Sequence, residues 1–101
     1  MDLGLRDKVA LVAGASRGIG RAAALGLAAE GCRLVMAARG EDALREAASE
    51  AAKAGVDALP VVCDVTVAAD AGRLIRASIE RFGRIDALVT SIHYSAPGDE
   101  D

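Results

Sequence analysis

The hydrophobic positions of the chain fall into short continuous runs that are separated by longer amphipathic stretches. The continuous runs predict strands at Val9–Ala13, Leu34–Ala38, Ala58–Cys63 and Ile85–Thr90. Runs that are apolar on both sides are typical of a parallel sheet that helices cover on both faces. The regular alternation of runs and amphipathic stretches therefore predicts an α/β chain built from β-α-β units.

The amphipathic stretches predict helices over Gly18–Glu30, Glu41–Ala54 and Ala68–Phe82. Each stretch is followed directly by a glycine, the residue that most often ends a helix. The residues expected to face the sheet are Ile19, Ala22, Ala23, Leu27 and Ala28 in the first helix, Leu44, Ala47, Ala48 and Ala51 in the second, and Ala71, Leu74, Ile75, Ser78, Ile79 and Phe82 in the third.

The strand order follows from one proline and from the handedness of the connections. Proline has no N–H to donate, so the strand that contains Pro60 is expected at a sheet edge, as the third strand is in the doubly wound order 3-2-1-4. Right-handed crossovers place the first two helices on one face and the third helix on the other. We therefore predict a partial Rossmann sheet, of order 3-2-1-4 with helices on both faces, over residues 1–90, followed by a polar C-terminal loop or tail over residues 91–101.

This packing leaves apolar surface uncovered. One helix cannot cover a four-stranded face, and the fourth strand is an apolar edge that invites pairing with another chain. We therefore expect either the front part of a longer protein or a truncated form that self-associates.

The first strand runs into a glycine-rich turn, Gly14-Ala15-Ser16-Arg17-Gly18-Ile19-Gly20, and then into the first helix. Gly14 lets the backbone leave the strand in a conformation that a side chain would block. Gly18 leaves room for a bulky anion beside the main chain, and Gly20 lets the helix pack closely on the strand. The first helical turn offers unpaired N–H groups and the positive end of the helix dipole, which suit a phosphate. A strand before the turn and a β-α-β unit around it favour a pyrophosphate cradle over a tight turn that binds nothing.

Composition narrows the class of partner. The chain has 101 residues, 52% of them hydrophobic, with one Phe, one Tyr and no Trp, which indicates one small domain with an aliphatic core. The net charge of −3 equals the charge of Asp99–Asp101, so the rest of the chain is neutral. Without a basic patch that contains aromatic residues we expect no nucleic-acid partner. Without a signal peptide or a long apolar run we expect no membrane partner and a cytoplasmic location.

The two cysteines are expected to stay apart. Cys32 begins the second strand and Cys63 ends the third, so they lie at opposite ends of neighbouring parallel strands, beyond the limit of about 7 Å for a disulfide. We interpret both as small core residues in a reducing compartment. With one histidine and no paired-cysteine motif, no metal site is expected.

The spacing Gly14-x-x-x-Gly18-x-Gly20 in this setting resembles the short-chain dehydrogenase/reductase family. The family usually has a threonine before the first glycine, where this chain has Ala13, a change that weakens the local hydrogen bonding of the turn but not the anion site. The resemblance covers nearly the whole chain and implies hydride transfer between a nicotinamide cofactor and a carbonyl or alcohol. It implies cofactor contacts from Gly14, Ser16, Arg17, Gly18, Ile19, Gly20, Arg39, Asp64, Val65 and Thr90.

The choice of cofactor is read at the tip of the second strand, where an acidic residue selects NAD and an arginine accommodates the 2′-phosphate of NADP. That tip reads Ala37-Ala38-Arg39-Gly40, with no carboxylate before Glu41. Arg17 in the glycine-rich turn would reach the same phosphate from the other side. Two guanidinium groups and no acid favour NADP(H), the alternative being that Arg39 is simply solvated at a strand end.

Two further segments carry the resemblance. Asp64-Val65 follows the third strand, and the resemblance implies that Asp64 contacts the adenine amino group while Val65 packs beside the ring. Asp64 or Thr66 could also cap the third helix, and both roles can hold together. After the fourth strand the family has Asn-Asn-Ala-Gly, whereas this chain has Thr90-Ser91-Ile92-His93, which keeps two hydrogen-bonding side chains but adds two bulky residues. We interpret His93-Tyr94-Ser95 as ordinary loop residues, not as a catalytic cluster.

The catalytic residues that the resemblance implies are absent from the printed sequence. The family uses a serine, a Tyr-x-x-x-Lys pair and an asparagine, and the lysine lowers the pKa of the tyrosine. Here the only tyrosine is Tyr94, the residue four positions later is Gly98, and no lysine follows Lys53. We therefore assign no catalytic residue and expect the 101-residue chain alone to be inactive. A non-catalytic nucleotide-binding or dimerisation module and a remnant without ligand are the alternative functions.

Overall fold

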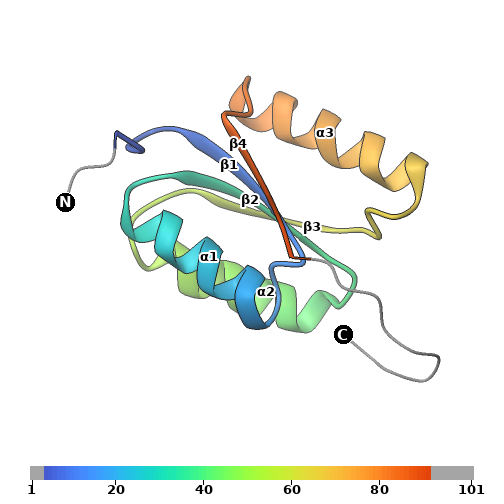
Figure 1. The fold of residues 1–101 in the computed structure, drawn as a ribbon, viewed down its shortest axis with the longest axis horizontal. Coiled ribbons are helices and arrows are strands. Elements are labelled where there is room, and N and C mark those ends of the chain that lie inside the picture. Colours follow the sequence, from blue (N-terminus) through green and yellow to red (C-terminus); the bar gives the residue numbers. More distant parts are fainter. Residues whose placement is uncertain (1–3, 92–101) are drawn as a thin grey trace.

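The computed structural model describes residues 4–91, and its strands and helices alternate along the chain (Figure 1). The strands are β1 (Val9–Ala13), β2 (Arg33–Ala38), β3 (Ala58–Val62) and β4 (Ala87–Thr90). The helices are α1 (Gly18–Ala29), α2 (Glu41–Ala52) and α3 (Ala68–Phe82). Every expected element is present, with ends that differ from the expected ones by at most two residues. The segment from Ile92 to Asp101, which includes nearly all of the predicted C-terminal tail, lies outside the described residues.

The strands form one parallel sheet in the order β3-β2-β1-β4, which confirms the predicted topology. β3 lies at an edge, and Pro60 in it stands opposite Met36 of β2. β1 and β2 are the central strands and are the most deeply buried, with every residue of β1 shielded from solvent. A run of apolar residues in β1 is therefore required by burial on both faces.

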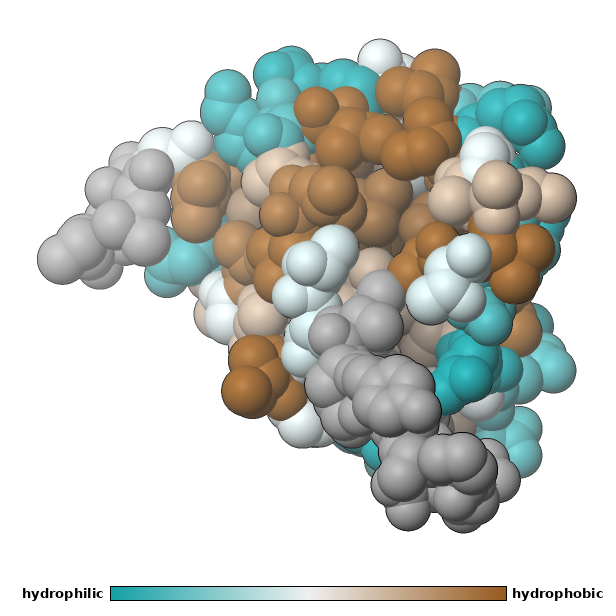
Figure 2. Space-filling view, turned by 45° about the vertical axis from the view of Figure 1, so that its right-hand side comes forward, coloured by the Kyte–Doolittle hydropathy of each residue, from teal (hydrophilic) through white to brown (hydrophobic). Residues whose placement is uncertain are grey.

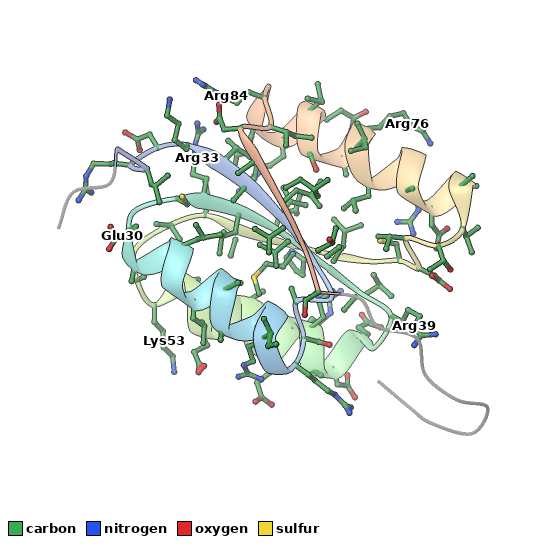
Figure 3. All side chains as sticks on the ribbon, viewed as in Figure 1. Glu30, Arg33, Arg39, Lys53, Arg76 and Arg84 are labelled. Atoms are coloured by element: carbon green, nitrogen blue, oxygen red, sulfur yellow. The ribbon has the colours of Figure 1, made fainter. Side chains whose placement is uncertain are left out.

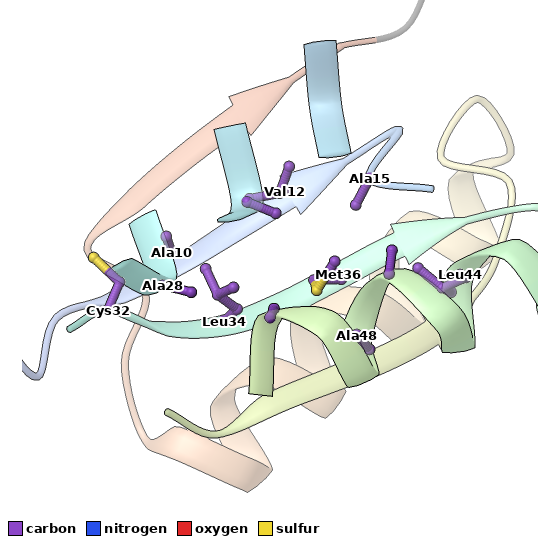
Figure 4. Packing of buried hydrophobic residues seen from close by; sticks show 12 residues of the cluster. Ala10, Val12, Ala15, Ala28, Cys32, Leu34, Met36, Leu44 and Ala48 are labelled. Atoms are coloured by element: carbon purple, nitrogen blue, oxygen red, sulfur yellow. The ribbon is translucent and has the colours of Figure 1, made fainter. Parts of the chain in front are cut away.

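Helices cover both faces of the sheet (Figure 1). α1 and α2 pack on one face, where the cluster shown in Figure 4 is buried, and α3 packs on the other. The first cluster consists of Ala10, Val12, Ala15, Ala24, Ala28, Cys32, Leu34, Met36, Leu44, Ala47, Ala48 and Ala51. The second consists of Leu11, Val35, Ala37, Val61, Cys63 and Leu74. The larger of these side chains each contribute about 1.5–3 kcal/mol through burial.

The expected buried face of α1 is confirmed at Ala28, which is buried, and at Leu27, which packs against the first cluster, but it is wrong at Ile19 and Ala22, which are exposed. The buried positions are Gly20, Ala24 and Ala28, whereas Ile19 is 80% exposed. These small residues recur every four positions, so they form a stripe along which the helix backbone lies close to the sheet. Arg21, one position on, reaches Glu46 and Glu50 of α2 at 3.3 Å and fixes the rotation of α1 against its neighbour.

α3 covers its face of the sheet only in part. Leu74 and Ser78 are buried as expected, but Ile75 and Ile79 are 47% and 46% exposed. Leu88 of β4 is 64% exposed. The expectation that a single helix leaves apolar surface uncovered on this face is therefore confirmed.

The two cysteines are buried and unpaired. Cys32 precedes β2, and Cys63 follows β3, where its N–H bonds the carbonyl of Ala38 at the far end of β2. Burial raises the pKa of both thiols, because it disfavours the charged thiolate.

Within the described part of the chain, no group of three or more His, Cys, Asp or Glu residues is placed to hold a metal ion. Across residues 4–91, no helix has the length and apolarity needed to cross a bilayer.

Candidate functional site

The carboxyl ends of the four parallel strands meet at one edge of the sheet. The glycine-rich turn follows β1 there, and Arg39, Asp64 and Thr90 lie at the ends of β2, β3 and β4. Figure 3 shows Arg39 at this end and Arg33, which begins β2, at the other. In open parallel sheets, ligands bind outside this edge where the strand order reverses, which here is between β1 and β4.

The backbone of the turn is held by its neighbours. The N–H groups of Gly14 and Ala15 both donate to the carbonyl of Ala37 in β2, at 2.8 and 3.0 Å. Gly14 has a φ of +77°, and a Cβ there would lie 2.4 Å from the carbonyl oxygen of Ser91 after β4. Only glycine combines this conformation with this close approach, as the sequence predicted.

The other two glycines have different surroundings. A Cβ on Gly20 would lie 2.0 Å from the carbonyl oxygen of Gly14, so the start of α1 rests directly on the turn. Gly18 has a φ of +56°, and a Cβ built on it would meet no atom within 4 Å. The space beside Gly18 is therefore open to solvent, as an anion next to the main chain requires.

The N-terminus of α1 carries uncompensated positive potential. No side chain caps it, and its first turn has no acidic residue. By contrast, α2 has Glu41 and Asp42 in its first turn and α3 has Asp70. Among the helices of residues 4–91, α1 alone presents its N–H groups and dipole to the strand ends without a carboxylate nearby. Ser16 is buried in the turn before it, and the exposed side chain of Ile19 lies in its first turn.

Charged side chains follow the neighbouring strands. Arg17 and Arg39 are both exposed. Asp64 accepts hydrogen bonds from the hydroxyl and the N–H of Thr66, at 2.6 and 3.0 Å, and these bonds lower the pKa of its carboxyl. The positive charge of Arg39 lowers the pKa of the Asp64 carboxyl further, so charged groups at the ends of β2 and β3 interact with each other.

The second role of Asp64 or Thr66, as a helix cap, is wrong. Val67 occupies the N-cap position of α3, and no side chain caps the helix. Asp64 instead bonds Thr66 within a tight turn before the helix. Val65 is half-buried against the cluster beneath α3, and Thr90 is exposed beside Ala13, its register partner in β1.

Sequence reasoning missed two residues that build this edge. Asp70 accepts the backbone N–H of Asp64 at 2.8 Å and so fixes the end of β3 to the first turn of α3. Ser91 donates its N–H to Ala13 at 3.0 Å and places its carbonyl against Gly14. The position of Asp70, an acidic residue in the first turn of a helix, could have indicated its role. The role of Ser91 could not be predicted from residue type, because it rests on backbone contacts.

The comparisons with known proteins agree with this geometry. The family model described as short chain dehydrogenase matches residues 8–96. The chain belongs to the short-chain dehydrogenase family. A putative ketoacyl reductase of Streptomyces coelicolor, a curated relative, is 43% identical over 85 residues, which are 84% of this chain and 33% of that protein.

Solved structures of the family share the fold. L-Sorbose reductase from Gluconobacter frateurii, solved with NADPH and L-sorbose, superposes with a TM-score of 0.91 at 38% identity, over 95% of this chain and 37% of that one. A xylitol dehydrogenase with bound NAD+ superposes with a TM-score of 0.81 at 37% identity, over 83% of this chain and 32% of that one. The present chain thus spans about a third of the length of the relatives it matches.

The contact between Gly20 and the turn predicts opposite effects for two substitutions in α1. Gly20→Ala should lower the free energy of unfolding by about 2 kcal/mol, because the new methyl group overlaps the Gly14 carbonyl. Gly26→Ala, where a Cβ meets nothing within 4 Å, should raise it by about 0.5–1 kcal/mol through helix propensity. Urea unfolding of both variants measures this. Equal stability of the two variants would show that α1 does not rest on the turn.

The bonds from Thr66 predict a change in the titration of Asp64. Thr66→Val removes the hydroxyl donor and should move the pKa of the Asp64 carboxyl up toward its ordinary value of 3.8. Because the folded-state pKa is lowered, the stabilisation from this carboxylate is present above pH 3.8 and is lost as the pH falls through the folded-state pKa. A ¹³C NMR titration of the carboxyl carbon measures the shift. An unchanged midpoint would contradict the assignment of the cause.

Proposed function

We propose that these residues form the NADP(H)-binding part of a short-chain dehydrogenase/reductase, a class of enzyme that reduces a carbonyl or oxidises an alcohol by hydride transfer. The observation that carries the proposal is the N-terminus of α1, which presents its N–H groups at the strand ends with no acidic residue in its first turn. A pyrophosphate supplies the negative charge that this helix end lacks. The open space beside Gly18 lets the phosphates approach the main chain.

The side chains around the turn support a dinucleotide rather than a bare phosphate. Ile19 projects from the first turn of α1 with 80% of its surface exposed, and its apolar surface would lie against the bound cofactor. Asp64 and Val65 at the end of β3 would hold the adenine. Thr90, at the end of β4, would lie on the nicotinamide side.

The preference for NADP(H) rests on two arginines. Some related structures contain NADPH and others contain NAD+, so family membership leaves the preference open. Here Arg17 in the glycine-rich turn and Arg39 at the end of β2 are both exposed, and no carboxylate stands at the end of β2 before Glu41. A guanidinium fits a phosphate with two parallel hydrogen bonds, whereas the ribose hydroxyl of NAD needs an acceptor.

The proposed role of these 101 residues is to bind and orient the cofactor, whose nicotinamide supplies the hydride. The proton-transferring pair of the family has no counterpart in the printed sequence, where Gly98 stands four residues after Tyr94. We therefore expect the purified 101-residue chain to bind NADPH without turnover of carbonyl substrates. A nucleotide-binding module without any chemistry behaves in the same way in the binding test, and assays of a longer chain with a Tyr-x-x-x-Lys pair separate the two functions.

Two substitutions at Gly18 test the anion cradle. Gly18→Asn fills the open space with a neutral side chain that tolerates a φ of +56°, and Gly18→Asp adds a negative charge of the same shape. Repulsion should weaken NADPH binding by Gly18→Asp about tenfold or more relative to Gly18→Asn. An aspartate at a helix N-terminus is favourable, so stability should be retained. Titration followed by nicotinamide fluorescence measures both affinities, and equal affinities would refute a phosphate at this position.

The arginines are tested by the ratio of affinities for NADPH and NADH. Arg17→Gln and Arg39→Gln should each weaken NADPH binding about tenfold and leave NADH binding nearly unchanged, because only NADPH carries the 2′-phosphate. Arg45→Gln is the matched control, since Arg45 is exposed on α2 and pairs with Glu41 at 2.8 Å. If the unsubstituted chain binds NADH more tightly than NADPH, the preference for NADP(H) is wrong.

A further inference from the structure

The backbone at the end of β3 is held from two sides by hydrogen bonds. The N–H of Cys63 donates to the carbonyl of Ala38 in β2 at 2.9 Å. The carbonyl of Val62 accepts a bond from the Arg73 guanidinium of α3 at 2.8 Å. This carbonyl and the N–H of Cys63 belong to one planar peptide group. The peptide group that leaves the strand is therefore fixed between β2 and α3.

The peptide groups on the two sides of the Asp64 Cα are held as well. Asp70, in the first turn of α3, accepts the N–H of Asp64 at 2.8 Å. The N–H of Val67 donates to the carbonyl of Asp64 at 3.0 Å. Because both planar groups that flank the Cα are bonded, the direction of the Cα–Cβ bond is fixed. The hydroxyl and the N–H of Thr66 then fix the carboxylate, at 2.6 and 3.0 Å.

The bond made by Asp70 is unusual for its position in a helix. Asp70 is the third residue after the N-cap residue Val67, and an acidic side chain there commonly accepts the N–H of the N-cap residue itself. Here the Val67 N–H is bonded to the carbonyl of Asp64, and the Asp70 carboxylate binds an N–H three positions before the N-cap. Asp70 therefore fixes the end of β3 rather than capping α3.

The first turn of α3 has no buried residue to hold it on the sheet. Within residues 4–91, the buried residues of α3 are Leu74 and Ser78, which lie beyond that turn. Packing is incomplete on this side, and Figure 2 shows hydrophobic side chains over a continuous area of the surface. The distance between the first turn and β3 therefore depends on the bonds of Asp70 and Arg73, whose charged groups lie 3.8 Å apart.

We propose that Asp70 is a positioning residue of the cofactor site, which acts through Asp64 by holding the Asp64 carboxylate where the adenine of the dinucleotide binds. This inference rests on the proposed function, because Asp64 has this role only if a dinucleotide binds at the strand ends. The bond between Cys63 and Ala38 joins the same segment to the residue before Arg39. The groups proposed for the adenine and for the 2′-phosphate thus keep a fixed separation.

Titration of the 101-residue chain with NADPH, followed by nicotinamide fluorescence, tests the proposal. Asp70→Ala removes the acceptor and should raise the Kd for NADPH about fivefold or more, because the freed N–H lets the peptide group before Asp64 turn. Asp70→Asn keeps an acceptor oxygen in the same place and should restore most of the affinity. Asp42→Ala, which removes an exposed acid from the first turn of α2, is the matched control and should not weaken binding.

A double-mutant cycle separates positioning from a general loss of structure. Asp64→Ala should itself weaken NADPH binding. Asp70→Ala should add a loss of less than about twofold when residue 64 is already alanine, because it acts only through the Asp64 side chain. A general loss of structure would instead multiply the two effects. Urea unfolding of each variant measures stability separately from affinity.

Three results would overturn the proposal alone. The first is an unchanged Kd in Asp70→Ala, and the second is the same loss of affinity with and without the Asp64 carboxylate. The third is an Asp70→Asn variant as weak as Asp70→Ala, which would assign the effect to charge rather than to the hydrogen bond. If the unsubstituted chain does not bind NADPH, or if Asp64→Ala binds it as tightly, the assigned adenine site is wrong and the role of Asp70 is wrong with it.

Discussion

The close approach of three backbone segments at the end of β1 is the constraint on which the structure depends. Gly14 lies against the carbonyl of Ser91, and Gly20 lies against the carbonyl of Gly14, with no room for a Cβ at either glycine. This contact fixes where α1 begins and how it is rotated. As a result, the N-terminal N–H groups of α1 are placed at the strand ends beside an open space, and Gly20, Ala24 and Ala28 face the sheet.

In that arrangement, main-chain groups and side chains have different proposed roles in binding. The groups proposed to hold the phosphates are main-chain N–H groups, so they depend on conformation rather than on residue type. The groups proposed to recognise the rest of the ligand are side chains at the tips of β2 and β3, where the positive charge of Arg39 lowers the pKa of the Asp64 carboxyl. The opposite end of the sheet is closed by structural contacts, such as the bond from the Val9 N–H to the Asp86 carboxylate at 2.8 Å. The proposed binding groups and these structural contacts thus lie at different ends of the same strands.

Sequence patterns predicted the fold correctly wherever a pattern is compatible with only one local structure. Apolar runs gave the strands, and Pro60 together with right-handed connections gave the order of the sheet. Ile19 was wrongly placed on the buried face of α1 because the prediction followed hydrophobicity, whereas the close approach of the backbone requires Gly20 there. Asp70 was missed because its partner is a main-chain N–H brought near by the turn after β3. Contacts made by the backbone leave little trace in residue type, which is why Asp70 and Ser91 were missed although the strands and their order were predicted.

Amide chemical shifts of the ¹⁵N-labelled chain during titration with NADPH test the central claim most directly. If main-chain groups after β1 hold the pyrophosphate, the largest shifts occur at Gly18, Ile19 and Gly20. Amides at the far end of the strands, such as those of Gly31 and Gly55, then remain unchanged. Saturable NADPH binding whose shifts are concentrated at that far end, or the absence of any shift at the turn, would contradict the claim.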